Sequence, residues 1–108
     1  LPQTLIFFEQ YNQLAKELYE AYPQNVEFKN GLAISYSKLG TFYKDEKGDK
    51  AKAREYFQQC FTIWEELSGA YPAYVEFRNN FDWAKTLQLL YSNRSLQLQR
   101  HTMHWWFE

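Results

Sequence analysis

Two histidines near the C-terminus have the spacing of a metal-binding pair. His101 and His104 are three residues apart, so on a helix they would share one face and could ligate zinc together with a third group. Glu108 is the one acidic or thiol side chain near them in the sequence. We therefore interpret the histidines as ordinary tail residues, and we predict no metal site and no cofactor.

Neighbouring carboxylates could perform acid–base catalysis, and they occur as Asp45-Glu46 and Glu65-Glu66. Adjacent residues of a helix do not face each other, however, and both pairs lie among other charged residues. The chain also has no glycine-rich phosphate loop and no recognisable set of serine, histidine and aspartate. We predict that the protein is not an enzyme and has no catalytic residues.

Charge and cysteine content exclude several classes of partner. The net charge is −1 with both signs interspersed, which predicts no nucleic-acid partner. The chain has no run of about twenty apolar residues and no signal-peptide pattern, which predicts no membrane partner.

A single cysteine, Cys60, falls on an apolar helix face, which favours a reducing, cytoplasmic location. The only methionine is Met103, so we expect a piece of a longer protein.

An internal repeat indicates how the chain is organised. Segment 21–30 reads AYPQNVEFKN, and it returns 49 residues later as AYPAYVEFRN in segment 70–79. Each copy contains the end of one expected helix, a proline that stops it and the start of the next helix. A repeat of this length is typical of stacked helical arrays.

Apolar residues recur at spacings of three and four, which predicts amphipathic helices. We expect these helices over about 4–22, 26–45, 50–70 and 74–91, with a charged turn around Gly48 between the second and the third. Aromatic residues make up 20% of the chain, which is typical of a packed helical protein. The predicted fold class is all-α, with four main helices and a C-terminal segment of unassigned structure.

The second and third expected helices resemble a tetratricopeptide repeat. The residues that match its pattern are Tyr36, Leu39-Gly40, Tyr43, Ala53, Phe57, Cys60 and Pro72. The period of 49 exceeds the usual value of about 34, so long-helix variants are the nearest match. The resemblance implies a right-handed superhelical stack of antiparallel helix pairs.

The same resemblance implies one domain over residues 1–108. Its parts are the second helix of a partial repeat (4–22), a complete repeat (25–72), a degenerate first helix (74–92) and a tail or cap (93–108). Such a domain would be a non-catalytic scaffold whose concave groove binds a peptide or a partner domain. The expected groove residues are Asn30, Ile34, Ser37, Thr41 and Lys44, with Asn79, Trp83, Thr86 and Leu90 as the members on the last helix.

Three adjacent large apolar residues, Trp105, Trp106 and Phe107, stand at the end of the chain. One helix face cannot bury all three, so they either cover the open end of the array, meet another chain, or have lost their cover at the chain boundary. The alternative function is therefore an oligomerisation or regulatory segment of a larger multidomain protein, which self-associates as a homo-oligomer through this aromatic end.

Overall fold

Four α-helices form most of the part of the chain that a computed structural model describes, residues 2–91. They are α1 (Pro2–Ala21), α2 (Val26–Phe42), α3 (Lys50–Ala70) and α4 (Val75–Tyr91), and a short π-helical turn, η1 (Tyr43–Lys47), continues α2. Residues 2–91 contain no β-strand, so the all-α prediction is confirmed for this part. The expected tail, 93–108, with its histidines and with Trp105, Trp106 and Phe107, lies outside the described residues.

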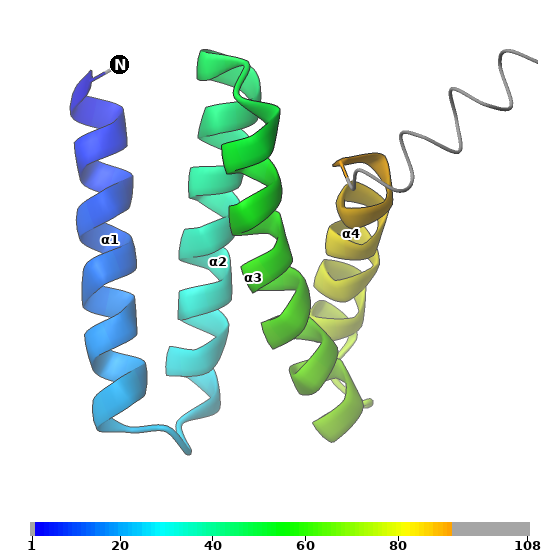
Figure 1. The fold of residues 1–108 in the computed structure, drawn as a ribbon. Coiled ribbons are helices and arrows are strands. Elements are labelled where there is room, and N and C mark those ends of the chain that lie inside the picture. Colours follow the sequence, from blue (N-terminus) through cyan, green and yellow to red (C-terminus); the bar gives the residue numbers. More distant parts are fainter. Residues whose placement is uncertain (1, 92–108) are drawn as a thin grey trace, which may run out of the picture.

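The helices lie side by side in chain order, and each runs antiparallel to the next (Figure 1). Contacts join α1 to α2, α2 to α3, and α3 to α4. Because α3 packs between two helices, it supplies much of the core, including Ala53, Phe57 and Cys60, which are fully buried. The short connections at residues 22–25, 48–49 and 71–74 make consecutive helices antiparallel neighbours.

Local capping signals set the ends of the helices. Asn25 caps α2, since its side chain accepts a hydrogen bond from the Phe28 backbone nitrogen at 3.0 Å. Asp49 caps α3 in the same way, with the Lys52 backbone nitrogen at 3.0 Å. Pro23 follows α1 as predicted, and the predicted bounds of α3 agree with the observed ones.

The end of the second expected helix differs from the prediction, because its last residues are π-helical and not α-helical. We expected one helix to about residue 45, but the α-helix ends at Phe42 and the chain continues through η1. Gly48 then takes a left-handed conformation with φ of 61°. The backbone N–H groups of Gly48 and Asp49 both donate to the Tyr43 carbonyl, which widens the last turn into a π-helix.

Gly40 marks the close approach of α2 and α3. A Cβ atom at this position would come within 2.5 Å of the Phe57 ring, so only glycine leaves room for that ring. Gly40 therefore has a packing role in this interface. The neighbouring tyrosines of the repeat pattern, Tyr36 and Tyr43, stack instead on Tyr56, with ring centroids 6.2 and 5.7 Å apart.

A buried hydrogen bond joins α1 to α2. The Asn12 side-chain nitrogen donates to the Ser35 hydroxyl at 2.8 Å, and that hydroxyl donates to the Leu32 carbonyl at 2.7 Å. Asn12 and Ser35 are both buried. At the repeat length of 49 residues, Asn12 corresponds to Phe61 of α3 and Ser35 corresponds to Ala84 of α4. The α3–α4 interface therefore has apolar residues where the α1–α2 interface has this polar pair.

We expect Ser35→Ala to lower the free energy of unfolding by about 1–3 kcal/mol, because the Asn12 amide loses its buried partner. The double variant Asn12→Leu with Ser35→Ala is expected to recover most of that loss, since removing both members of a buried polar pair is nearly neutral. Urea unfolding followed by circular dichroism compares the two. A double variant no more stable than Ser35→Ala would contradict this account of the pair.

Candidate functional site

Two adjoining hollows lie along one side of α2. The first has a volume of about 460 Å³ and is lined by Thr4, Phe8, Ser37, Lys38, Thr41, Phe42, Asp45, Glu46 and Trp83. The second has a volume of about 380 Å³ and is lined by Ile34, Ser37, Trp64, Glu76, Asn80 and Trp83. Because Ser37 and Trp83 line both hollows, the two form one continuous surface, which we term the α2 groove.

Trp83 is the aromatic centre of the α2 groove. Its ring stands edge-on to Phe57 and to Trp64, with centroid distances of 5.8 and 6.1 Å and interplanar angles of 89° and 74°. Both supporting rings are buried, whereas Trp83 is 41% exposed. The structure therefore holds one side of the Trp83 ring against the core and leaves the rest accessible to a ligand.

The charges around the α2 groove are mainly negative. Asp45, Glu46 and Glu76 line it, and Lys38 is the one basic residue among the lining residues of the two hollows. Lys44 lies beside the groove and pairs with Asp45, and this hydrogen bond raises the pKa of Lys44. With Asp45 partly neutralised in this way, Glu46 and Glu76 favour a ligand that carries basic groups.

Several residues expected from the sequence meet along the α2 groove. Ile34, Ser37 and Thr41 lie on α2, and Trp83 faces them from α4. The Ser37 hydroxyl donates to the Ile34 carbonyl at 2.6 Å, so its oxygen can still accept a hydrogen bond from a ligand. That these residues bind a partner stays a prediction.

The remaining expected residues lie elsewhere. The Asn30 side-chain oxygen accepts a hydrogen bond from the Trp64 indole nitrogen at 2.8 Å, so Asn30 joins α2 to α3. Asn79, Thr86 and Leu90 are exposed on α4 but do not line the α2 groove. The structure therefore divides the expected set between the groove, one interhelical contact and the outer surface of α4.

Other groove residues were not expected from the sequence. Thr4 and Phe8 come from the start of α1, where Phe8 packs edge-on against Phe42 with a centroid distance of 6.4 Å. Glu76 and Asn80 come from the first half of α4. The antiparallel order could have indicated the contribution of α1, because it places the start of α1 level with the end of α2.

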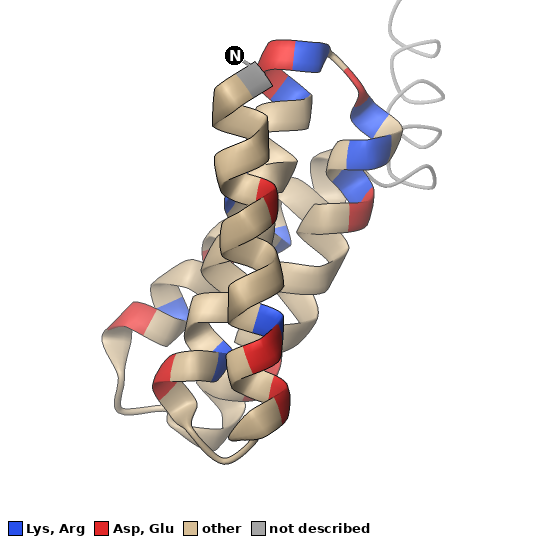
Figure 2. Ribbon diagram, turned by 90° about the vertical axis from the view of Figure 1, so that its left-hand side faces the viewer, with Lys and Arg blue, Asp and Glu red and all other residues tan. Residues whose placement is uncertain are grey.

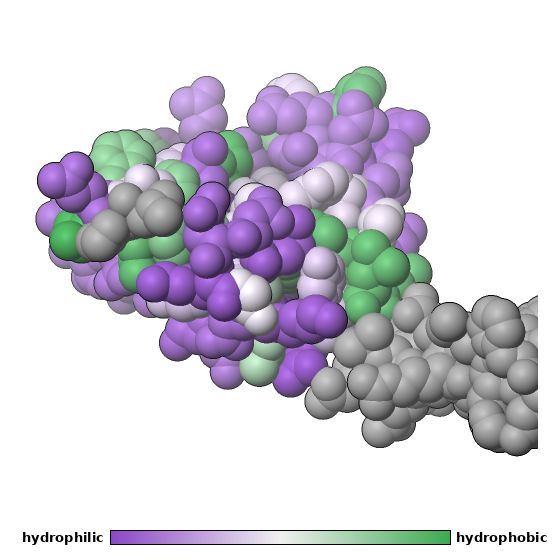
Figure 3. Space-filling model, turned by 90° about the horizontal axis from the view of Figure 1, so that it is seen from above, coloured by the Kyte–Doolittle hydropathy of each residue, from purple (hydrophilic) through white to green (hydrophobic). Residues whose placement is uncertain are grey.

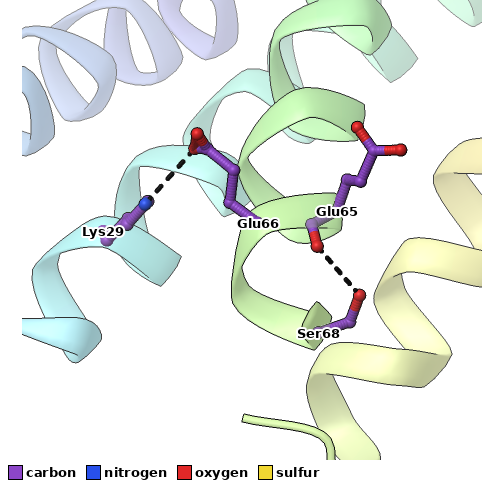
Figure 4. Close-up of polar contacts among 4 residues, drawn as sticks. All are labelled: Lys29, Glu65, Glu66 and Ser68. Atoms are coloured by element: carbon purple, nitrogen blue, oxygen red, sulfur yellow. Dashed lines mark hydrogen bonds and ion pairs between the residues drawn. The ribbon is translucent and has the colours of Figure 1, made fainter. Parts of the chain in front are cut away.

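Glu66 and Cys60, two side chains with catalytic potential, are engaged in structural contacts. Glu66 forms an ion pair with Lys29 at 3.2 Å, whereas the neighbouring Glu65 side chain points away from it (Figure 4). Cys60 is fully buried, and burial raises the pKa of its thiol to about 12, so the thiol stays protonated at neutral pH. Within residues 2–91, no three His, Cys, Asp or Glu side chains are grouped so that they could hold a metal ion.

Comparison of the chain with family models, with curated proteins and with solved structures finds no match. In the part of the chain from residue 2 to residue 91, no helix has both the length and the apolar character required to cross a membrane. Because the comparisons supply no relative, a functional proposal rests on the side chains of the α2 groove.

Proposed function

We propose that the protein is a non-catalytic scaffold that binds a segment of a partner protein in the α2 groove. The half-exposed Trp83 ring, held edge-on by Phe57 and Trp64, is the observation that carries this proposal. Aromatic side chains in such surroundings are typical binding hot spots. A ring that is already fixed also loses little conformational entropy when a ligand packs on it.

The ligand is a peptide segment with an apolar anchor flanked by Lys or Arg. Phe8, Ile34, Phe42 and Trp83 supply apolar surface for the anchor. The carboxylates of Glu46 and Glu76 lie in the two halves of the groove and would attract basic side chains on either side of the anchor. An acidic peptide would meet these carboxylates, so we do not expect the groove to select one.

The architecture that we propose with this function is tetratricopeptide-like. In it, the helices form a right-handed superhelical stack, residues 25–72 are a complete repeat, and α2 and α4 are equivalent helices on the concave side. The antiparallel order of the helices and the Phe57 contact at Gly40 support the proposal, because the repeat pattern relies on small residues where its two helices touch. A cytoplasmic location is part of the same proposal.

Selection from a displayed random-peptide library on the protein tests the groove. We expect the enriched peptides to carry an apolar residue next to Lys or Arg. Their affinity should fall by about 30-fold in Trp83→Ala, which corresponds to a hot-spot loss of about 2 kcal/mol. Thr41→Arg should weaken binding as well, because it fills the groove without removing the packing of Trp83.

Thr86→Arg is the matched control, since Thr86 is exposed on α4 outside the groove. It should leave the affinity unchanged, and circular dichroism should show that all three variants are folded. Peptides that bind Trp83→Ala and Thr41→Arg as tightly as the unchanged protein would contradict the proposal. Loss of binding in Thr86→Arg alone would place the site on the outer surface of α4.

A further inference from the structure

A third hollow lies where the start of α2, the α3–α4 turn and the start of α4 meet. Its volume is about 310 Å³, and it is lined by Val26, Glu27, Asn30, Tyr71, Tyr74, Glu76 and Phe77. We term it the aromatic pocket. Both helix starts lie at the lower end of the molecule, and each carries an acidic residue in its first turn (Figure 2). The pocket therefore combines three aromatic rings with two carboxylates.

The three aromatic side chains of the pocket contact one another. Their ring centroids are 5.8 Å apart for Tyr71 and Tyr74, 6.3 Å for Tyr71 and Phe77, and 5.5 Å for Tyr74 and Phe77. Phe77 is buried, whereas Tyr71 and Tyr74 are exposed. Because the centroids are this close together, one cation in the pocket can lie within about 6 Å of all three, which is the reach of a cation–π interaction.

The backbone of the α3–α4 turn holds the two tyrosines together. The Tyr74 backbone nitrogen donates to the Tyr71 carbonyl at 3.1 Å. The first repeat has the same turn, from Tyr22 to Asn25, but there the Asn25 side chain caps α2. Tyr74 stands at the equivalent position before α4, and its ring has no oxygen near enough to form such a cap. A departure from local helix preference, here in favour of an exposed ring, is typical of functional positions.

The aromatic pocket has an unbalanced negative charge. The described residues that line it include Glu27 and Glu76 but no Lys or Arg, and Arg78 donates instead to the Pro72 carbonyl at 3.1 Å. The lysines of the charged turn 44–50 lie at the opposite end of α2, which is mainly hydrophilic around that turn (Figure 3). Within residues 2–91, lysine ammonium groups lie over other rings, those of Tyr36, Tyr43, Tyr56 and Phe81. The pocket is therefore available to a cation from another molecule.

A guanidinium group is the cation that suits this pocket best. Its planar face stacks on aromatic rings, and its N–H groups donate in pairs to carboxylates. A lysine ammonium group donates to carboxylates but has no flat face to stack. A quaternary ammonium group attracts the rings but has no N–H group to donate to Glu27 or Glu76. Arginine alone can use the rings and the carboxylates in full.

We propose that the aromatic pocket binds an arginine side chain of the partner segment, with its guanidinium group between the tyrosine rings and the two carboxylates. Glu76 also lines the α2 groove, so a segment whose apolar anchor lies beside Trp83 can continue into the pocket. The proposal rests on the proposed function only for the source of the arginine. It narrows one basic residue of that segment to arginine and places it on the side of the anchor nearer to the start of α2.

Capped arginine, N-acetyl-arginine amide, tests the pocket without any peptide. In a titration at millimolar concentrations followed by NMR, we expect saturable chemical-shift changes at the backbone amides of the α3–α4 turn and the first turn of α4. Capped citrulline, which has nearly the same shape without the charge, should cause none. Capped lysine should bind about fivefold more weakly than capped arginine, because it lacks the stacking contact.

Tyr74→Ala and Glu27→Gln should each lower the affinity for capped arginine by about five- to tenfold, because each removes one kind of contact with the guanidinium group. Tyr22→Ala is the matched control, since Tyr22 lies in the equivalent turn of the first repeat and is 59% exposed, as Tyr74 is. It should leave the affinity unchanged. Circular dichroism should show that all three variants are folded.

Several results would overturn the arginine site. They are capped citrulline or capped lysine that binds as tightly as capped arginine, and a Tyr74→Ala variant with unchanged affinity. Selected peptides that depend on Trp83 but bind Tyr74→Ala as tightly as the unchanged protein would also remove the arginine site, while leaving the proposed function in place. Tyr74-dependent binding of capped arginine by a protein that selects no peptide would support the pocket and contradict the α2 groove.

Discussion

Replacing Phe57 with alanine is expected to lower the free energy of unfolding by about 3–5 kcal/mol. Phe57 of α3 is fully buried, and its ring contacts α2 at Gly40. The centroid of the ring lies 5.8 Å from that of Trp83 and 5.9 Å from that of Tyr91, both on α4. The substitution therefore loosens both interfaces of the central helix at once. Since a domain of this size has a total stability of about 5–15 kcal/mol, urea unfolding should show a large shift of the midpoint.

Gly40 provides the matched test of the Phe57 contact. Gly40→Ala should lower the free energy of unfolding by about 1–3 kcal/mol, because the added Cβ would lie 2.5 Å from the Phe57 ring. Gly31→Ala on the same helix is the control, since an added Cβ there meets nothing within 4 Å, and it should raise stability by about 0.5–1 kcal/mol.

A double-mutant cycle then isolates the pair. Gly40→Ala combined with Phe57→Leu should be more stable than the sum of the two single effects predicts, because leucine leaves room for the added methyl group. If the two changes in the free energy of unfolding were strictly additive, the two residues would not be in contact.

Trp64→Ala is expected to lower the free energy of unfolding by about 3–5 kcal/mol, as Phe57→Ala does. The Trp64 side chain is buried, it lines the α2 groove, and its indole nitrogen donates to Asn30 at 2.8 Å. Its ring also supports Trp83, at a centroid distance of 6.1 Å. This substitution should therefore weaken both folding and peptide binding, and the two losses are measured by urea unfolding and by titration of a selected peptide.

Trp64→Phe separates the hydrogen bond from the packing. It keeps most of the aromatic surface against Trp83 but removes the indole donor, so we expect a loss of about 1 kcal/mol in stability and little change in peptide affinity. Asn30→Leu should then add little further loss in the Trp64→Phe background, because its partner is already absent. Equal effects of Asn30→Leu with and without the indole donor would contradict a role for this bond.

The proline stops, the Asn25 and Asp49 caps and the left-handed Gly48 were accessible from the sequence. Each depends on hydrogen bonds or steric contacts between residues only a few positions apart. A glycine inside a helix also indicates close packing, but that its neighbour is the Phe57 ring was decided by the register of α3 against α2. The Asn12–Ser35 bond was not predicted, since neither residue belongs to an apolar pattern and their partnership depends on the exact register of α1 on α2.

The sequence by itself determined four helices and the places where each one ends, because helical periodicity and the proline and glycine stops are properties of the chain alone. Only the tertiary structure decided which of the remaining side chains share a surface. It brought Ser37 and Trp83 together along one groove, turned Asn30 toward Trp64, and left Phe7 and Leu14 exposed. These outcomes depend on the rotation and the register of each helix against its neighbour, which are fixed by contacts between residues far apart in the chain.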